Sequence, residues 1–258
     1  MKRIIYLIMC CLSIWLVACN NDDKDVLSSI DENSVSENAA ENGYKWVDLG
    51  LPSGTKWATC NVGAKKPQDY GNYYAWGEVI QKSFYSWSTY KYGSDYDQLT
   101  KYCNKSEYGV NDNKTVLELE DDAAYMNWGG KWRMPTDEQQ TELRKQCYWV
   151  WTESYNGVKG YIVYKAKTSS DKGVYVYEGE IQSSYTISDV HIFLPAAGHR
   201  DSYGFDGAGF GGSYWSSSLS VSRPGRACIV SLEPTSVVGS YSTSRSNGYS
   251  VRPVIPGE

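Results

Sequence analysis

Tyrosine and tryptophan dominate the apolar residues of this chain, with 23 Tyr and 10 Trp against 4 Phe. Both side chains are largely apolar but end in a hydroxyl or an indole N–H, so a fold that buries many of them must also supply hydrogen-bond partners. Over 258 residues, 41% are apolar and 21% charged, which excludes a collagen, a coiled coil and a wholly disordered chain. The length suits one domain of roughly 200 residues or two small ones.

The first 18 residues predict a lipoprotein signal peptide. Lys2 and Arg3 precede an apolar run over residues 4–18, which is too short to cross the roughly 30 Å hydrocarbon core of a membrane as a helix. The run ends in L-V-A-C at Cys19, which resembles the lipobox of bacterial lipoproteins, where the cysteine is acylated after cleavage. The alternative is ordinary secretory cleavage after Ala18, with Cys19 as a free thiol. Acyl chains on Cys19 would make the membrane a permanent partner.

Residues 19–43 are expected to form the lipidated N-terminus and a disordered acidic tether. Residues 20–43 contain seven acidic residues, one lysine and no aromatic residue, whereas the chain from Tyr44 onward carries a net charge of only −1. Acidic residues directly after Cys19 resemble the signal that exports Bacteroidota lipoproteins to the outer face of the outer membrane. A merely soluble spacer is the alternative. We therefore expect a lipid-anchored protein of the outer membrane, exposed at the cell surface, and the acidic pI of 5.2 argues against nucleic-acid binding.

Seven cysteines reduce to four in the predicted mature domain. Cys10 and Cys11 leave with the signal peptide and Cys19 is acylated, so the remaining cysteines are Cys60, Cys103, Cys147 and Cys228. An even number in an oxidising compartment allows three pairings, but buried free thiols are an equal alternative. None lies in a C-x-x-C motif or near a histidine, so no zinc site is expected.

The globular part, residues 44–258, predicts few helices among many short strands, which is an α+β pattern. A helix is expected over residues 115–126, ended by Gly129 and Gly130. A second follows Pro135, because Thr136 and Gln139 form a T-x-x-Q capping box. Residues 70–96 predict long loops and short strands. Strands are expected over residues 44–51, 55–62, 148–152, 160–167, 173–177, 191–194, 214–217, 228–232 and 249–254.

Six segments of the globular part resemble one known family. They are D-L-G-L-P-S-G-T-K-W-A-T-C-N-V-G-A (48–64), Y-G-N-Y-Y-A-W-G-E (70–78), D-D-A-A through W-G-G-K-W-R-M-P-T (121–136), I-F-L-P-A-A-G-H-R (192–200), G-G-S-Y-W-S-S-S (211–218) and S-V-R-P-V (250–254). These strings resemble the Fibrobacter succinogenes major paralogous domain, a family common in surface lipoproteins of Bacteroidota. The resemblance implies a C-type-lectin-like fold, shared with formylglycine-generating enzymes, and no common activity. Residues 165–189 look longer than the family's usual hairpin.

The sequence offers little for catalysis. His191 and His199 are its only histidines, and a structural role is favoured for both. No serine stands in a G-x-S-x-G elbow. Gly207, Gly209 and Gly212 spell G-x-G-x-x-G, but the residues after them lack a helical pattern, so they do not predict a dinucleotide site. The E-P-T string at Glu233 is only a fragment of a lectin calcium motif. We expect no catalytic residue, no cofactor and no metal site.

Five residues are candidates for ligand binding: Trp87, Tyr90, Tyr92, Asp95 and Tyr96. Flat rings beside hydroxyls and a carboxylate can stack on sugar rings and bond their hydroxyls. The alternative is that these rings form part of the domain's own core. Trp132, Trp149, Trp151 and Trp215 are expected in the core.

Three functions remain open on this sequence. The first is a non-catalytic recognition or adhesion lipoprotein that binds a glycan or a protein. The second is a structural subunit for fimbria or envelope assembly. The third is an oxidoreductase like the formylglycine-generating enzymes, which would need a pair of cysteines or a metal in one pocket, whereas that part of the chain has only Cys228.

Overall fold

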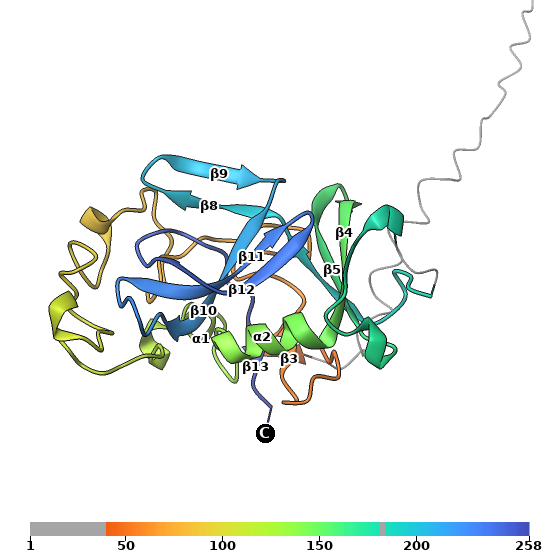
Figure 1. Cartoon of the computed structure of the whole chain (residues 1–258), viewed down its shortest axis with the longest axis horizontal. Coiled ribbons are helices and arrows are strands. Elements are labelled where there is room, and N and C mark those ends of the chain that lie inside the picture. Colours follow the sequence, from red (N-terminus) through yellow and green to blue (C-terminus); the bar gives the residue numbers. More distant parts are fainter. Residues whose placement is uncertain (1–39, 181–183, 258) are drawn as a thin grey trace, which may run out of the picture. The chain divides into compact units, whose positions relative to one another are not determined.

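The computed structural model describes residues 40–180 and 184–257 (Figure 1). The predicted signal peptide, Cys19 and the tether as far as residue 39 lie outside the described residues. The described residues begin at Ala40, and residues 40–43, which the sequence places in the tether, already belong to the described fold, which corrects the predicted boundary at Tyr44. Strand β1 (Ala40–Glu41) pairs with the next strand, and the Trp132 indole donates to the Glu41 carbonyl at 2.8 Å. These tertiary partners order four residues whose composition alone is that of a linker.

The described strands form three sheets. The first has the order β1, β2 (Tyr44–Val47), β3 (Lys56–Ala58) and β13 (Val254–Ile255). The second has the order β12 (Ser236–Ser244), β11 (Arg226–Glu233), β10 (Gly212–Leu219), β8 (Ala197–Asp201) and β9 (Gly204–Ala208). The third has the order β6 (Tyr175–Tyr177), β4 (Cys147–Tyr155), β5 (Val158–Lys165) and β7 (His191–Pro195). Pairing is antiparallel except between β8 and β10 and between β4 and β6.

The helix predicted after Pro135 is confirmed as α2 (Asp137–Gln146). Thr136 and Gln139 form the expected capping box, in which the Thr136 hydroxyl accepts the Gln139 N–H and the Gln139 side chain accepts the Thr136 N–H. Figure 1 shows α2 lying along the second sheet, and α2 contacts β10, β11 and β12. The buried Gln140 amide donates to the carbonyls of Tyr214 and Trp215, which joins the helix to β10.

The helix predicted over residues 115–126 is shorter and lies further along the chain. A 3-10 turn, η3 (Leu119–Asp121), leads into α1 (Ala123–Trp128), which ends at Gly129 as expected. Asp122 decides where α1 begins, because its carboxylate accepts the N–H groups of Ala124 and Tyr125. Other 3-10 turns are η1 (Trp87–Thr89), η2 (Ser106–Tyr108), η4 (Ser169–Asp171) and η5 (Glu178–Glu180).

The third sheet is buried on both faces. Trp149 and Trp151 of β4 face one hydrophobic cluster, while Tyr148 and Val150 face another. Tyr185, from the segment 165–189 that looks longer than the family pattern, covers the second face, where its ring stacks on Tyr148 with centroids 4.3 Å apart. Tyr185 therefore helps to bury the second face of the sheet.

Most of the abundant rings are buried, and many of their polar tips are paired, although the indole N–H groups of Trp57 and Trp149 have no partner among the described residues. Trp132, Trp149, Trp151 and Trp215 are fully buried, as predicted. Buried tyrosines commonly donate to backbone carbonyls, as Tyr85 does to Tyr73 at 2.6 Å and Tyr214 to Pro195 at 2.7 Å. Such bonds offset the cost of removing each hydroxyl from water.

Strand prediction is incomplete at the C-terminal end of the chain. Strands β8, β9 and β12 are not predicted, because glycine and serine interrupt their apolar alternation. The strand expected over residues 249–254 is reduced to β13 plus isolated bridges at Tyr249 and Ser250. The regular structure of the described residues is mainly strand, with two α-helices, which is compatible with α+β or with a mainly β fold.

Candidate functional site

The structure divides the five predicted ligand-binding residues into a surface set and a buried set. Trp87 is partly buried and Tyr96 is 56% exposed, and both line one pocket. Tyr90 and Tyr92 are only 7% and 8% exposed, so the prediction that they stack on a ligand is wrong: both rings belong to the hydrophobic core. Asp95 is exposed beside the pocket, and its carboxylate accepts the Tyr96 N–H at 2.7 Å. Asp95 therefore shapes the loop that presents Tyr96.

The pocket encloses about 380 Å³, within the range of about 300–1,000 Å³ typical of small-molecule sites. Its lining combines three rings and two guanidinium groups with small residues: Trp87, Tyr96, Tyr108, Arg223, Gly225, Arg226 and Ser244. No acidic residue and no cysteine is among them. The pocket thus presents apolar faces beside positively charged hydrogen-bond donors.

Leu99 joins the two loops that carry Tyr96 and Tyr108. The Leu99 N–H donates to the Tyr108 carbonyl at 2.9 Å, and the Leu99 carbonyl accepts the Val110 N–H at 2.8 Å. Gly109 has a φ of 136°, and a Cβ atom there would overlap the Leu99 backbone, so only glycine permits this approach. The aromatic wall of the pocket is therefore fixed by backbone bonds.

The opposite wall is the connection between β10 and β11. Backbone bonds close this turn, with the Arg223 N–H donating to the Ser220 carbonyl at 3.0 Å and the Arg226 N–H to the Arg223 carbonyl at 2.8 Å. A Cβ atom on Gly225 would lie 2.7 Å from the Tyr96 carbonyl oxygen. The absence of a side chain at Gly225 lets the two walls meet at the base of the pocket.

Arg245 is fully buried beneath the pocket and bonds both walls. Its guanidinium donates to the Tyr90 hydroxyl at 2.8 Å and to the carbonyls of Tyr102, Pro224 and Lys101 at 3.0 to 3.1 Å. These four acceptors come from three segments of the chain. A buried cation that uses its donors on carbonyls and a hydroxyl acts here as a structural cross-link.

A series of edge-to-face ring contacts leads from the pocket into the core. Trp87 packs against Tyr90 with centroids 5.3 Å apart, Tyr90 against Tyr92 at 6.1 Å, and Tyr92 against Tyr102 at 5.7 Å. Tyr102 in turn meets Trp76 at 5.2 Å. Because each ring is held by its neighbour, the Trp87 indole is fixed at the edge of the pocket.

Asp121 anchors the inner end of this ring series. Its carboxylate is 1% exposed and accepts the hydroxyls of Tyr92 and Tyr102. Lys101 lies at 2.7 Å and Lys91 at 3.1 Å. Burial by itself would raise the pKa of Asp121, but the hydrogen bonds from Lys101, Tyr92 and Tyr102 outweigh it and lower the pKa to about 2. Asp121 is therefore ionised at neutral pH.

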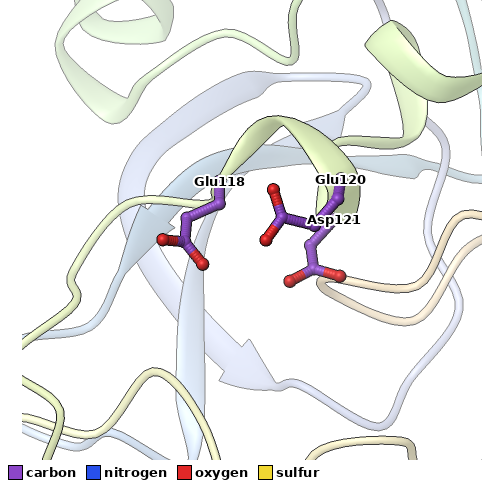
Figure 2. Close-up of side chains that lie close together, drawn as sticks. All are labelled: Glu118, Glu120 and Asp121. Atoms are coloured by element: carbon purple, nitrogen blue, oxygen red, sulfur yellow. The ribbon is translucent and has the colours of Figure 1, made fainter.

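Glu118, Glu120 and Asp121 gather around η3 closely enough to suggest a metal centre (Figure 2). The Lys101 ammonium, however, lies among them, at 2.7 Å from Glu118, 3.4 Å from Glu120 and 2.7 Å from Asp121. Although burial opposes it, bonding to these carboxylates raises the pKa of Lys101, so the ammonium is retained. The cluster is therefore an ion-pair network centred on a lysine, with a structural role.

The four cysteines of the domain are free thiols, which resolves the alternative left open by their number. Burial raises the pKa of Cys147 to about 12 and that of Cys228 to about 11. Burial also raises the pKa of Cys60. Thiolates are thus disfavoured at these three positions at neutral pH, and the thiols fill space as small apolar groups.

Both histidines have structural surroundings, as favoured from the sequence. His191 is buried in β7, with Nδ1 2.7 Å from the Asp189 carbonyl and Nε2 3.3 Å from the Tyr155 hydroxyl. His199 lies in β8 with Nε2 3.6 Å from an Asp201 carboxylate oxygen. Neither is among the residues that line the pocket.

The glycine string at residues 207–212 leads into a strand. Gly212 opens β10, and a Cβ atom there would lie 2.9 Å from the Ala197 nitrogen. A dinucleotide site needs a helix after these glycines, so the structure agrees with setting that motif aside. The glycines serve the close approach of β8 and β10.

Comparisons of the chain with known protein families, with curated proteins and with solved structures gave no match. Among the described residues, no helix is long and apolar enough to cross a membrane.

Sequence reasoning misses most of the pocket and its support. Tyr108 ends the 3-10 turn η2, Arg223 lies in the β10–β11 connection and Arg226 opens β11, all without a motif. The pocket joins both arginines to rings more than 100 positions away. Arg245 follows a serine-rich strand, a context typical of an exposed charge. Asp121 and Asp122 stand together in one of the family-like strings. No signal in the sequence shows that Asp121 is buried and accepts bonds from two tyrosines and a lysine.

Proposed function

We propose that this chain is a surface-anchored lipoprotein whose globular domain binds a glycan in the pocket between Trp87 and Arg226, without catalysing a reaction. The pocket carries the proposal: its three rings offer apolar faces and its two arginines offer donors, the combination that holds a sugar ring and its hydroxyls. The rigid support from Arg245 and the ring series favours recognition, because little ordering is needed on binding.

The fold and family are part of the same proposal. We propose a C-type-lectin-like domain of the Fibrobacter succinogenes major paralogous type. Support comes from the family-like strings, from mainly antiparallel sheets with two α-helices, and from the long loops that build the pocket. A signal peptide, an acylated Cys19 and an acidic tether would place this domain outside the cell, on the outer membrane.

A second candidate function is docking into a larger assembly, such as a fimbrial or envelope structure. It is favoured by the exposed aromatic residues around the β8–β9 hairpin, where Tyr203 is 98%, Phe210 79% and Phe205 47% exposed. Figure 1 shows this hairpin at one side of the second sheet, where β9 is the edge strand. An oxidoreductase receives no such support, since the pocket lining contains no cysteine.

Substitution of the pocket rings tests glycan binding directly. On a glycan array, the purified domain is expected to bind a defined subset of glycans. Trp87→Ala and Tyr96→Ala should each weaken that binding at least tenfold, about 1.4 kcal/mol, because each removes a stacking face. Tyr203→Ala is the matched control: it deletes an exposed ring outside the pocket and should leave binding unchanged. Isothermal titration with the best array glycan measures both effects.

Two results would count against glycan binding. An array without any signal above background would remove its basis, and loss of binding in Tyr203→Ala with retention in Trp87→Ala would move the site to the β8–β9 hairpin. Trp87 is partly buried, so Trp87→Ala could lose binding by disturbing the fold. Tyr96 is more than half exposed, so a loss of binding in Tyr96→Ala reports on the pocket itself.

The anchor is tested separately by fractionation. The full chain, expressed in a bacterium that processes lipoproteins, should be recovered with membranes and should be cleaved by protease added to intact cells. Cys19→Ala should release the protein into the soluble fraction, because no acyl chain then holds it. Cys60→Ala, which removes a thiol of the folded domain, should stay with membranes. Equal fractionation of wild type and Cys19→Ala would contradict lipidation.

A further inference from the structure

The lining of the pocket carries two positively charged residues and no acidic one, and the exposed Asp95 lies beside it. Arg223 and Arg226 are the two positively charged residues. Within residues 40–180 and 184–257, the ion pairs are made by lysines and one histidine, and none involves an arginine. Neither Arg223 nor Arg226 is therefore ion-paired with a carboxylate in the described part of the chain.

The same guanidinium groups keep unused hydrogen-bond donors. Arg226 donates one N–H to the Ser242 carbonyl at 3.0 Å. The Arg223 side chain is exposed and makes no hydrogen bond to any other described residue. Each arginine has five N–H donors in a planar fork that matches the two oxygens of a carboxylate or sulfate. Most of these donors remain available to a ligand.

The β10–β11 connection, which contains Arg223 and leads into Arg226 at the start of β11, is held in place. In addition to the backbone hydrogen bonds within this connection, two side chains donate to its carbonyls. The Asn104 amide donates to the Val221 carbonyl at 3.1 Å, and the Lys105 ammonium donates to the Ser222 carbonyl at 2.9 Å. Asn104 and Lys105 directly precede η2, the turn that ends with Tyr108. The cationic wall and the aromatic wall are thus connected, which fixes the spacing between charge and ring.

From these observations we infer that the ligand is an acidic saccharide, a sugar ring that bears a carboxylate or a sulfate. This inference rests on the proposed function and narrows it. The Trp87 and Tyr96 rings stack on the apolar face of the sugar, while Arg223 and Arg226 bind its anionic group. A neutral saccharide would leave both guanidinium groups without an anion, so the pocket should discriminate by charge.

Titration with matched oligosaccharides tests this inference. The probes are trigalacturonate, its fully methyl-esterified form and neutral galactotriose, with a sulfated galactose oligomer as the second anion source. The wild-type domain should bind at least one anionic probe at least tenfold more tightly than the ester and the neutral sugar, and less tightly as salt rises. Binding of either anion supports the inference, and their relative affinity identifies which group is preferred.

Charge-matched variants separate the pocket from the overall field of the protein. Arg223→Gln combined with Arg226→Gln should remove the preference for the anionic probe. Lys131→Gln combined with Lys145→Gln removes the same charge at exposed positions outside the pocket and should retain it. Loss of the preference in both double variants would assign it to net charge and overturn the inference.

The outcomes also distinguish this inference from the proposed function. If the domain binds trigalacturonate and its ester equally well, and Trp87→Ala loses both, the inference of an acidic ligand is overturned. The proposal of glycan binding would then still stand. The acidic ligand is likewise refuted if an array glycan without charge binds in a Trp87-dependent way while every anionic probe fails. Absence of binding to every probe and every array glycan would overturn both.

Discussion

Arg245→Met is expected to lower the free energy of unfolding by about 3–5 kcal/mol, one of the two largest effects in this protein. The side chain is fully buried, and its loss leaves the Tyr90 hydroxyl and the carbonyls of Lys101, Tyr102 and Pro224 without their donor. An unpaired buried polar group costs about 1–3 kcal/mol, so the losses accumulate despite methionine's good packing. Denaturant unfolding followed by tryptophan fluorescence measures the change.

Two further arginine variants sharpen this experiment. Arg245→Lys keeps the charge but cannot reach four separate acceptors with one ammonium, so we expect an intermediate loss. Arg223→Met is the control, because Arg223 is exposed and should change stability by no more than about 0.5 kcal/mol. If Arg245→Met unfolded at the wild-type denaturant concentration, the cross-linking role of Arg245 beneath the pocket would be refuted.

Asp121→Ala is expected to destabilise the domain by about 3–5 kcal/mol, because it leaves two buried tyrosine hydroxyls and the Lys101 ammonium without their shared acceptor. Glu120→Gln is the matched control from the same cluster. The Glu120 side chain is 64% exposed and lies 3.4 Å from Lys101, so its loss should cost no more than about 1 kcal/mol. Equal effects of the two substitutions would show that burial does not set the importance of Asp121.

The Asp121 contribution should also depend on pH in a defined direction. Its folded pKa of about 2 lies below the ordinary value of 3.8, so the stabilisation is complete above pH 3.8 and is lost as pH falls through about 2. The difference in unfolding free energy between wild type and Asp121→Asn should therefore shrink from pH 4 toward pH 2. A difference that stays constant over this range would contradict the ion-pair assignment.

The neighbouring Asp122 shows why this pH dependence must be measured against the Asp121 variant and not in the wild type alone. Burial raises the pKa of Asp122 to about 6, against opposing hydrogen bonds from Tyr125, Met134 and Ala124. The folded state then holds more protons than the unfolded state between about pH 4 and pH 6, so this group stabilises the fold as pH falls through that range. Two adjacent aspartates thus act in opposite directions over different pH ranges.

Local patterns are sufficient wherever the structure depends on neighbours in sequence. The capping box at Thr136 places the start of α2, the glycine at position 129 places the end of α1, and alternation around Trp149 places β4. In these cases the hydrogen bonds and the buried face are set within a few residues. Strand β12 escapes prediction because its apolar periodicity is interrupted by serine and glycine, and it is ordered by pairing with β11.

The sequence by itself determined that tyrosine and tryptophan side chains would build much of the core, that the regular structure would be many short strands with few helices, and that the aromatic stretch ending at Tyr96 was a candidate binding segment. Only the tertiary structure decided which of those rings line a pocket, since Trp87 and Tyr96 do so while Tyr90 and Tyr92 are buried in the core. The reason is physical: the pocket, the buried Arg245 and the ionised Asp121 are defined by contacts between segments far apart in the chain. Periodicity within one segment carries no information about such contacts.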